Sequence, residues 1–165
     1  MTPKGAHKAL KKLESEEVIM PETIGNATIY HLRFESDFAR TKAQIALFEH
    51  PSSTYVRVQS KDFERLRSYA MVAILFGSIL KKGEQARDID VLFIVEEKKY
   101  KELKKEIGIL QKIKTKHIHA IFQTPEDFVR TLKKKDEVIL DILRTGTILW
   151  GQNNIVESIA EVMIR

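Results

Sequence analysis

The sequence predicts an α/β (α+β) protein with a small mixed sheet and flanking helices. Two apolar runs, one ending at Phe76 and one at 91–95, have the length and character of buried strands. Between the second run and a third predicted strand at 116–123 lies an amphipathic helix at 98–114, whose apolar residues recur three or four positions apart. The fold prediction rests on this order of strand, helix and strand.

Composition limits the possible classes of protein. The 165 residues suit one domain of ordinary size or two small ones, and 43% hydrophobic with 31% charged residues predict a soluble chain with a core. No apolar run approaches the roughly 20 residues that span a bilayer, and the N-terminus lacks the apolar segment of a secretion signal. The absence of cysteine excludes disulfides and thiolate metal sites and fits a cytoplasmic protein. A formal charge of +5 favours polyanionic partners without choosing among them.

The first 34 residues predict a helix followed by a hairpin. Thr2-Pro3 is a good helix start, because a capping side chain precedes a proline at the first helical position. Gly25-Asn26 then separates two segments with strand character, 18–23 and 27–34. Such a turn between two strand-like segments predicts a β-hairpin.

In the middle of the chain the sequence predicts a second helix and, after it, a boundary between the N-terminal segment and the rest of the chain. The helix spans 36–49, and four of its residues are available for burial: Phe38, Ile45, Leu47 and Phe48. A turn signal at 50–53 is the best boundary with the rest of the chain. The alternation at 54–58 then predicts a short strand, and Ser60 is expected to cap a helix that carries Phe63, Leu66 and Tyr69 on one side.

The C-terminal part predicts three more helices and a short extended piece. Thr124 begins a helix with a capping box. The next helix spans 136–145 and is closed by Gly146, and an extended piece follows at 147–151. A last helix is expected at 155–164.

Two aspartates at the start of the second strand indicate a metal and phosphate site. Side chains alternate along a strand, so Asp88 and Asp90 point to the same side while Ile89 points into the core. Paired carboxylates suit Mg²⁺, which one or two carboxylates together with substrate phosphates often hold. Gly77 permits a sharp turn close to a ligand, and Ser78 offers a hydroxyl and a cap for the short helix that follows. Together these residues suggest a site for a metal-bound nucleoside triphosphate.

The same residues resemble the signature of the DNA polymerase beta superfamily, in particular the minimal nucleotidyltransferases. The matching segments are LFGS at 75–78 and DIDVL at 88–92, with Gly83 at the glycine usually found between them. The later run DILRTGTILWG resembles the closing segment of these proteins, so the resemblance extends over about 63–151. It implies a polymerase-beta-like nucleotidyltransferase fold in a domain at 54–165.

The resemblance also implies an activity and its cofactors. A member of this family would transfer NMP, most often AMP, from ATP or another nucleoside triphosphate to an acceptor hydroxyl on a protein or nucleic acid. Asp88 and Asp90 would then hold Mg²⁺, and Gly77, Ser78 and one of Lys81 and Lys82 would contact the β and γ phosphates. Asp88 and Asp90 are therefore the predicted catalytic and metal-binding residues.

The chain departs from the family pattern at two places. Catalytic members usually carry a third carboxylate on the strand that corresponds here to 116–123, but this segment contains no Asp or Glu. His119 can take that position, although Mg²⁺ prefers oxygen ligands to imidazole. The family often has an arginine before its glycine, where this chain has Lys81 and Lys82. The triphosphate site therefore looks better preserved than the catalytic centre.

The N-terminal segment 1–50 resembles the last helix and the wing of a winged helix-turn-helix domain, joined to a linker helix. Four lysines, Lys4, Lys8, Lys11 and Lys12, concentrate positive charge on the first helix, where nucleic acid could bind. The helices that normally precede these elements are not in the sequence. The segment can therefore be a truncated DNA-binding domain, one completed by another subunit, or a protein interaction module.

Two classes of function follow from these observations. One is a nucleotidyltransferase. The other is a catalytically impaired relative that binds DNA as a regulator, or that acts as the antitoxin-like partner of a HEPN-type protein, as minimal nucleotidyltransferases often do. The hairpin and the last helix at 155–164 are plausible surfaces for a homodimer.

Overall fold

The computed structural model describes residues 2–48 and 53–164, so part of the predicted turn at 50–53 lies outside the described residues. In chain order its elements are α1 (Pro3–Ser15), β1 (Ile19–Ile24), β2 (Ala27–Leu32), α2 (Asp37–Ala46), α3 (Thr54–Phe63), the 3₁₀ turn η1 (Glu64–Leu66), β3 (Val72–Phe76), α4 (Ser78–Lys82), the 3₁₀ turn η2 (Gly83–Gln85), β4 (Asp88–Ile94), α5 (Glu97–Gln111), β5 (His117–Gln123), α6 (Pro125–Lys133), α7 (Glu137–Thr145), β6 (Thr147–Trp150) and α8 (Gln152–Met163). None of these helices is long and apolar enough to cross a membrane.

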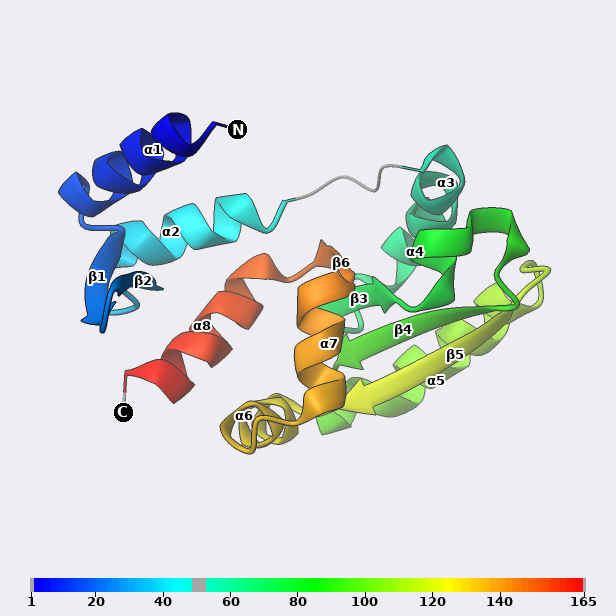
Figure 1. Ribbon diagram of the computed structural model, residues 1–165. Helices are drawn as coiled ribbons and strands as arrows, with labels where there is room; N and C mark the ends of the chain where they lie inside the picture. Colours follow the sequence, from blue (N-terminus) through cyan, green and yellow to red (C-terminus); the bar gives the residue numbers. More distant parts are fainter. Residues whose placement is uncertain (1, 49–52, 165) are drawn as a thin grey trace.

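Four strands form the central sheet, in the order β5-β4-β3-β6 (Figure 1). β3 runs antiparallel to both β4 and β6, whereas β4 and β5 are parallel and are connected by α5. The sheet is therefore mixed, and the predicted α/β fold with its βαβ unit is confirmed.

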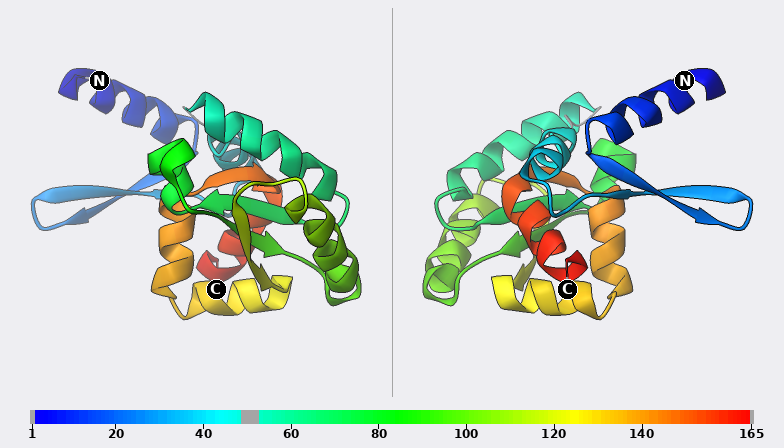
Figure 2. Two further views of the ribbon diagram at one scale, coloured as in Figure 1. Left: turned by 90° about the vertical axis from the view of Figure 1, so that its right-hand side faces the viewer. Right: turned by 90° about the vertical axis from the view of Figure 1, so that its left-hand side faces the viewer.

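Helices cover both faces of this sheet, because its central strands are apolar on both sides. On one face, α3 and α5 pack through Phe63, Leu103 and Leu110 on the odd-numbered residues of β3 and β4. On the other face, α6, α7 and α8 pack on the even-numbered residues of the same strands. The two layers are visible from the side in Figure 2. Asp88 and Asp90 are even-numbered, so they belong to the face that α6, α7 and α8 cover.

The predicted strand at 54–58 is wrong, since this segment begins helix α3. Val56 and Phe63 are both buried and lie seven positions apart, which is two helical turns, while Val58 is 54% exposed. The β-branched alternation around Val56 favours a strand only weakly, and packing of the helix on the sheet outweighs it. The predicted cap at Ser60 is wrong for the same reason, because Ser53 occupies the cap position.

The predicted burial along α2 is also largely wrong. Phe38, Ile45 and Phe48 are 52%, 64% and 65% exposed, whereas Ala39 is fully buried and Leu47 packs partly against the core. The cause is that α2 packs mainly on α8, so only the side of α2 that carries Ala39 is covered. Other helix bounds shift only slightly: α5 ends at Gln111 and α8 begins at Gln152, three residues earlier than predicted.

α1 and the hairpin of β1 and β2 project away from the sheet domain, and together with α2, which lies on α8, they form an N-terminal arm at 2–48 (Figure 2). The predicted helix start is confirmed, since Thr2 Oγ1 accepts a hydrogen bond from the Gly5 amide at 3.2 Å, and so is the hairpin of β1 and β2. Among the described residues 2–48, only Val18 and Ala39 are buried. The arm therefore has almost no core of its own.

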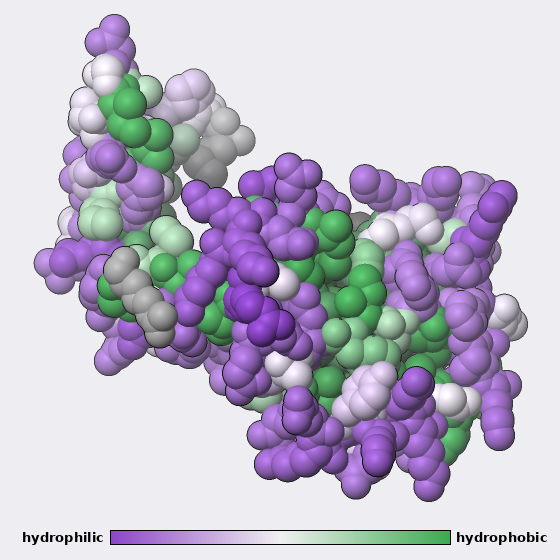
Figure 3. Space-filling view, turned by 90° about the horizontal axis from the view of Figure 1, so that it is seen from below, coloured by the Kyte–Doolittle hydropathy of each residue, from purple (hydrophilic) through white to green (hydrophobic). Residues whose placement is uncertain are grey.

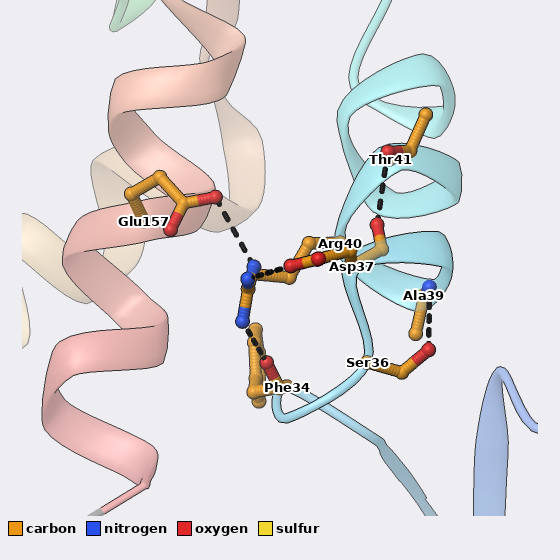
Figure 4. A network of polar contacts seen from close by, with 7 residues as sticks. All are labelled: Phe34, Ser36, Asp37, Ala39, Arg40, Thr41 and Glu157. Atoms are coloured by element: carbon orange, nitrogen blue, oxygen red, sulfur yellow. Dashed lines mark hydrogen bonds and ion pairs between the residues drawn. The ribbon is translucent and has the colours of Figure 1, made fainter.

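Arg40 joins the arm to the sheet domain (Figure 4). Its guanidinium donates to the Phe34 carbonyl oxygen at 2.5 Å, pairs with Asp37 on the same helix, and reaches Glu157 Oε1 on α8 at 3.3 Å. Only 21% of the Arg40 side chain is exposed, so these charge-assisted contacts are partly shielded from water. Arg40 thus connects the end of the hairpin, α2 and α8.

Replacing Arg40 with alanine is expected to loosen α2 from α8. The variant loses one hydrogen bond to a carbonyl and two ion pairs, which together contribute about 1–2 kcal/mol. Amide hydrogen exchange in α2 should become roughly tenfold faster, while exchange in β3 and β4 should not change. Arg144→Ala, which removes an exposed guanidinium from α7, is the control. Unchanged exchange in α2 of Arg40→Ala would show that these contacts do not hold the arm.

Candidate functional site

The turn between β3 and α4 forms one half of the site. β3 ends at Phe76, and Gly77 follows with φ 78° and ψ −151°, a conformation open essentially to glycine alone. Gly77 occupies the cap position of α4 and Ser78 is its first helical residue, with no side-chain capping bond. The prediction that Ser78 caps this helix is therefore wrong, although its hydroxyl and amide lie at the turn as expected.

Asp88 and Asp90 form the other half, at the start of β4. Ile89 between them is fully buried, so the two carboxylates share the opposite side of the strand, as predicted. Asp88 is exposed, whereas the Asp90 side chain is 22% exposed. A Cβ atom on Gly77 would lie only 2.4 Å from Asp90 Oδ2. The structure thus brings the Gly-Ser turn and the aspartate pair together, and the Asp90 carboxylate lies against the Gly77 backbone, in the space that a side chain on residue 77 would fill.

Two histidines on β5 lie beside the aspartates. The parallel register of β4 and β5 aligns Asp88 with His117 and Asp90 with His119. His119 Nδ1 lies 3.2 Å from Asp90 Oδ1, and its side chain is 65% exposed. Described residues 117–123 of β5 contain no carboxylate, and His119 is the residue of this strand that the register aligns with Asp90.

These donors fit part of a magnesium site. In the described ranges, no group of three or more histidine, aspartate or glutamate side chains is arranged to hold a metal. Two neighbouring carboxylates nevertheless match what Mg²⁺ takes from a protein when substrate phosphates supply further oxygens. The residues present therefore suit a cation that arrives with a triphosphate better than one held by protein ligands alone.

The cations near the turn differ in their positions. Lys81 and Lys82 are exposed in the last turn of α4, at the opposite end of this short helix from Gly77 and Ser78. Lys116 holds the loop before β4, because its ammonium donates to the carbonyl oxygens of Glu84 and Ala86, both at 2.6 Å. Arg87, exposed and directly before Asp88, is a cation that the sequence analysis missed. Its position next to Asp88 in the sequence could have indicated it as a candidate phosphate-binding residue.

The lysines of α1 are partly neutralised by acidic neighbours. Lys11 Nζ donates to Glu14 at 2.8 Å, and this hydrogen bond raises the pKa of Lys11. Lys12 lies 3.8 Å from Glu16. Glu16 also accepts from Lys42 on α2 at 2.5 Å, and that bond lowers the pKa of the Glu16 carboxyl. Lys4 and Lys8 lie on the same helix and are exposed, so the basic surface of α1 is smaller than its lysine count implies.

Two hollows of the described surface lie away from the aspartates. A groove of about 650 Å³ runs between α6 and α8, and its lining includes Met71, Arg130 and Asn154. A second, of about 740 Å³, lies beside the ends of β4 and β5, where Glu96 and Thr124 line it. Both are at the opposite end of the strands from Asp88. The candidate site, by contrast, lies at the start of β4, where Asp88 is exposed and the Asp90 side chain is 22% exposed.

Comparisons with known proteins agree with this geometry. The family model described as "Polymerase beta, Nucleotidyltransferase" matches residues 62–155, from the end of α3 to the start of α8. No curated protein and no solved structure matches the chain. The match leaves out the N-terminal arm, so the winged-helix resemblance stays a prediction. It covers more than half of the chain and includes the Gly-Ser turn, both aspartates and β5. The chain therefore belongs to the polymerase beta nucleotidyltransferase family.

Proposed function

We propose that the protein binds a Mg²⁺-bound nucleoside triphosphate and transfers its NMP group, AMP being the first candidate, to a hydroxyl of a protein or nucleic acid. One observation carries this proposal: the Asp90 carboxylate lies against the backbone of Gly77. The two halves of the family signature, at 75–78 and 88–92, thus meet as one surface. A phosphate bound at the turn would lie beside a pair of carboxylates that bind its cation.

Each residue then has a definite role. Asp88 and Asp90 would hold the cation, which would neutralise charge on the attacking hydroxyl oxygen and on the pyrophosphate that leaves. The amides at Gly77 and Ser78 and the Ser78 hydroxyl contact the β and γ phosphates, and Arg87, Lys81 or Lys82 adds positive charge to that end of the nucleotide. His119, beside Asp90, is the available group for accepting the proton of the attacking hydroxyl, since histidine is the side chain that most often acts as a general base.

A calorimetric titration with a non-hydrolysable ATP analogue tests the proposal. Wild-type protein is expected to bind the analogue only when Mg²⁺ is present, and Asp88→Asn should weaken binding at least about tenfold, because it removes one of two charged ligands. Asp141→Asn, which neutralises an exposed carboxylate on α7, serves as a matched control and should bind like the wild type. Mg²⁺-independent binding, or equal affinity of Asp88→Asn and wild type, would contradict the assignment of the site.

A second candidate function is favoured by the absence of a carboxylate on β5. In it the chain retains the nucleotide surface without efficient transfer and acts in the cytoplasm as a regulator, through DNA or through a HEPN-type protein. Basic α1 supports DNA as the partner, but its pairing with Glu14 and Glu16 weakens that support. A gel shift with duplex DNA that falls steeply with salt would favour the regulator.

A further inference from the structure

The hairpin of the arm is a two-stranded sheet with two outer edges. β1 pairs with β2 from Ile19–Leu32 to Ile24–Ala27, and within the described residues no third strand joins either edge. A lone two-stranded hairpin is marginally stable in water. It extends away from the sheet domain, so a second molecule can approach it (Figure 2).

The two outer edges differ in their capacity to bind another strand. Arg33 donates its amide to the Val18 carbonyl oxygen at 3.0 Å, so the backbone groups of Arg33 face β1. Continuing this alternation along the register makes Pro21–Tyr30 a non-hydrogen-bonded pair. The nitrogen of Pro21 therefore faces outward. Because it carries no hydrogen, the outer edge of β1 lacks one of the donors that a further strand would need. On β2 the backbone groups of Thr28 and Tyr30 face outward, and this strand has no proline. The edge of β2 is thus the one open to pairing.

The residues of β2 fit a second copy of the same strand. When two copies of one strand pair about a two-fold axis, a charged residue near the axis meets a like charge, which is destabilising. β2 reads Ala-Thr-Ile-Tyr-His-Leu and contains no Lys, Arg, Asp or Glu. An axis at Ile29 places Thr28 opposite the partner's Tyr30 in a hydrogen-bonded pair, and each Ile29 beside its equivalent.

An exposed apolar surface adjoins this edge. Met20, Ile24 and Ile29 lie on one side of the hairpin by strand alternation, and they are 45%, 55% and 43% exposed. The same side carries one polar pair, Glu22 with His31, whose side chains lie 2.6 Å apart. Figure 3 shows hydrophobic residues gathered along the projecting arm at its upper left. Joining two hairpins edge to edge would bring two such surfaces together into one apolar face.

The same hairpin is poorly suited to nucleic acid. Residues 19–32 contain neither lysine nor arginine, and their formal charge is that of Glu22 alone. Contacts with phosphate supply most of the affinity of a DNA-binding wing, and they need cations. The chemistry of the hairpin therefore favours a protein strand over DNA.

We propose that the chain forms a two-fold dimer by antiparallel pairing of β2 with β2 of a second copy. The two hairpins form one four-stranded sheet, with the Thr28 and Tyr30 backbone groups of each copy bonded to those of the other. This dimer is independent of nucleotide binding, because Gly77, Asp88 and Asp90 lie in the sheet domain and not on the arm.

A pair of proline substitutions tests this arrangement. Thr23 and Thr28 face each other in one non-hydrogen-bonded pair, so proline at either position removes one outward amide, from β1 or from β2 respectively. In sedimentation and light-scattering measurements the full-length wild type is expected to be a dimer. Thr28→Pro should raise the dimer dissociation constant at least about 30-fold, because both copies lose an interchain hydrogen bond, whereas Thr23→Pro should remain dimeric.

The two variants are matched in residue type and strand geometry, and far-UV circular dichroism checks their folding. Equal dissociation of Thr23→Pro and Thr28→Pro, or a Thr28→Pro variant as dimeric as the wild type, would overturn the proposal. So would a wild-type chain that stays monomeric at about 100 μM, whether or not it shifts duplex DNA.

Discussion

Replacing Gly77 with alanine is expected to lower stability and to abolish Mg²⁺-dependent binding of a nucleotide analogue. At φ 78° and ψ −151° an alanine is strained, which costs about 1–3 kcal/mol of unfolding free energy. Its Cβ would also lie 2.4 Å from Asp90 Oδ2 and 3.2 Å from Asp90 Cγ, so the carboxylate must move. A displacement of about 1 Å at such a group can cost roughly 100-fold in function. Denaturant unfolding and calorimetry measure the two effects.

Gly25→Ala separates backbone strain from displacement of Asp90. Gly25 also has a positive φ, 60°, but a Cβ there meets nothing within 4 Å. This control should lose stability without losing nucleotide affinity. If Gly77→Ala bound the analogue as tightly as Gly25→Ala, the contact between Gly77 and Asp90 would not define the site.

The central part of the site was predictable because its parts are local. Alternation along β4 places Asp88 and Asp90 on one side whatever the rest of the fold does. Gly77 marks a turn by its chemistry, and an antiparallel pairing of β3 with β4 brings that turn to the start of β4. The placement of His119 near the aspartates was anticipated only through the family resemblance, and local pattern could not give it, because the register between parallel strands depends on how α5 packs across the sheet.

The wrong predictions, at 54–58 and along α2, have a different cause. They depend on which elements pack against these segments, and the sequence does not show this. Segment 54–58 alternates like a strand, yet Val56 and Phe63 are buried together on a helix. Phe38 and Ile45 are apolar at helical spacing, yet both are more than half exposed in the part of the chain that the structure describes. The hydrophobic pattern indicates which residues favour burial, but it does not indicate whether another element of the same chain buries them. The hairpin illustrates this, since its turn at Gly25-Asn26 was predictable and its exposed apolar side was not.

Replacing His119 with aspartate is expected to strengthen Mg²⁺ binding and any nucleotidyl transfer. The register places the new carboxylate beside Asp90, where His119 Nδ1 now lies 3.2 Å from Asp90 Oδ1. Three clustered carboxylates repel one another, so the variant should be less stable than wild type in EDTA and should gain more from Mg²⁺. A tenfold gain in affinity corresponds to a rise of about 3–6 °C in the midpoint of thermal unfolding.

His119→Asn provides the matched control, because it removes the imidazole without adding charge. Its unfolding midpoint should respond to Mg²⁺ no more than that of the wild type. Transfer of label from α-labelled ATP to components of a cell extract should rise in His119→Asp at least about tenfold, because a carboxylate there both holds the cation and accepts a proton. If all three proteins responded equally to Mg²⁺, β5 would take no part in the metal site. Asp88 and Asp90 alone would then set its affinity for the cation.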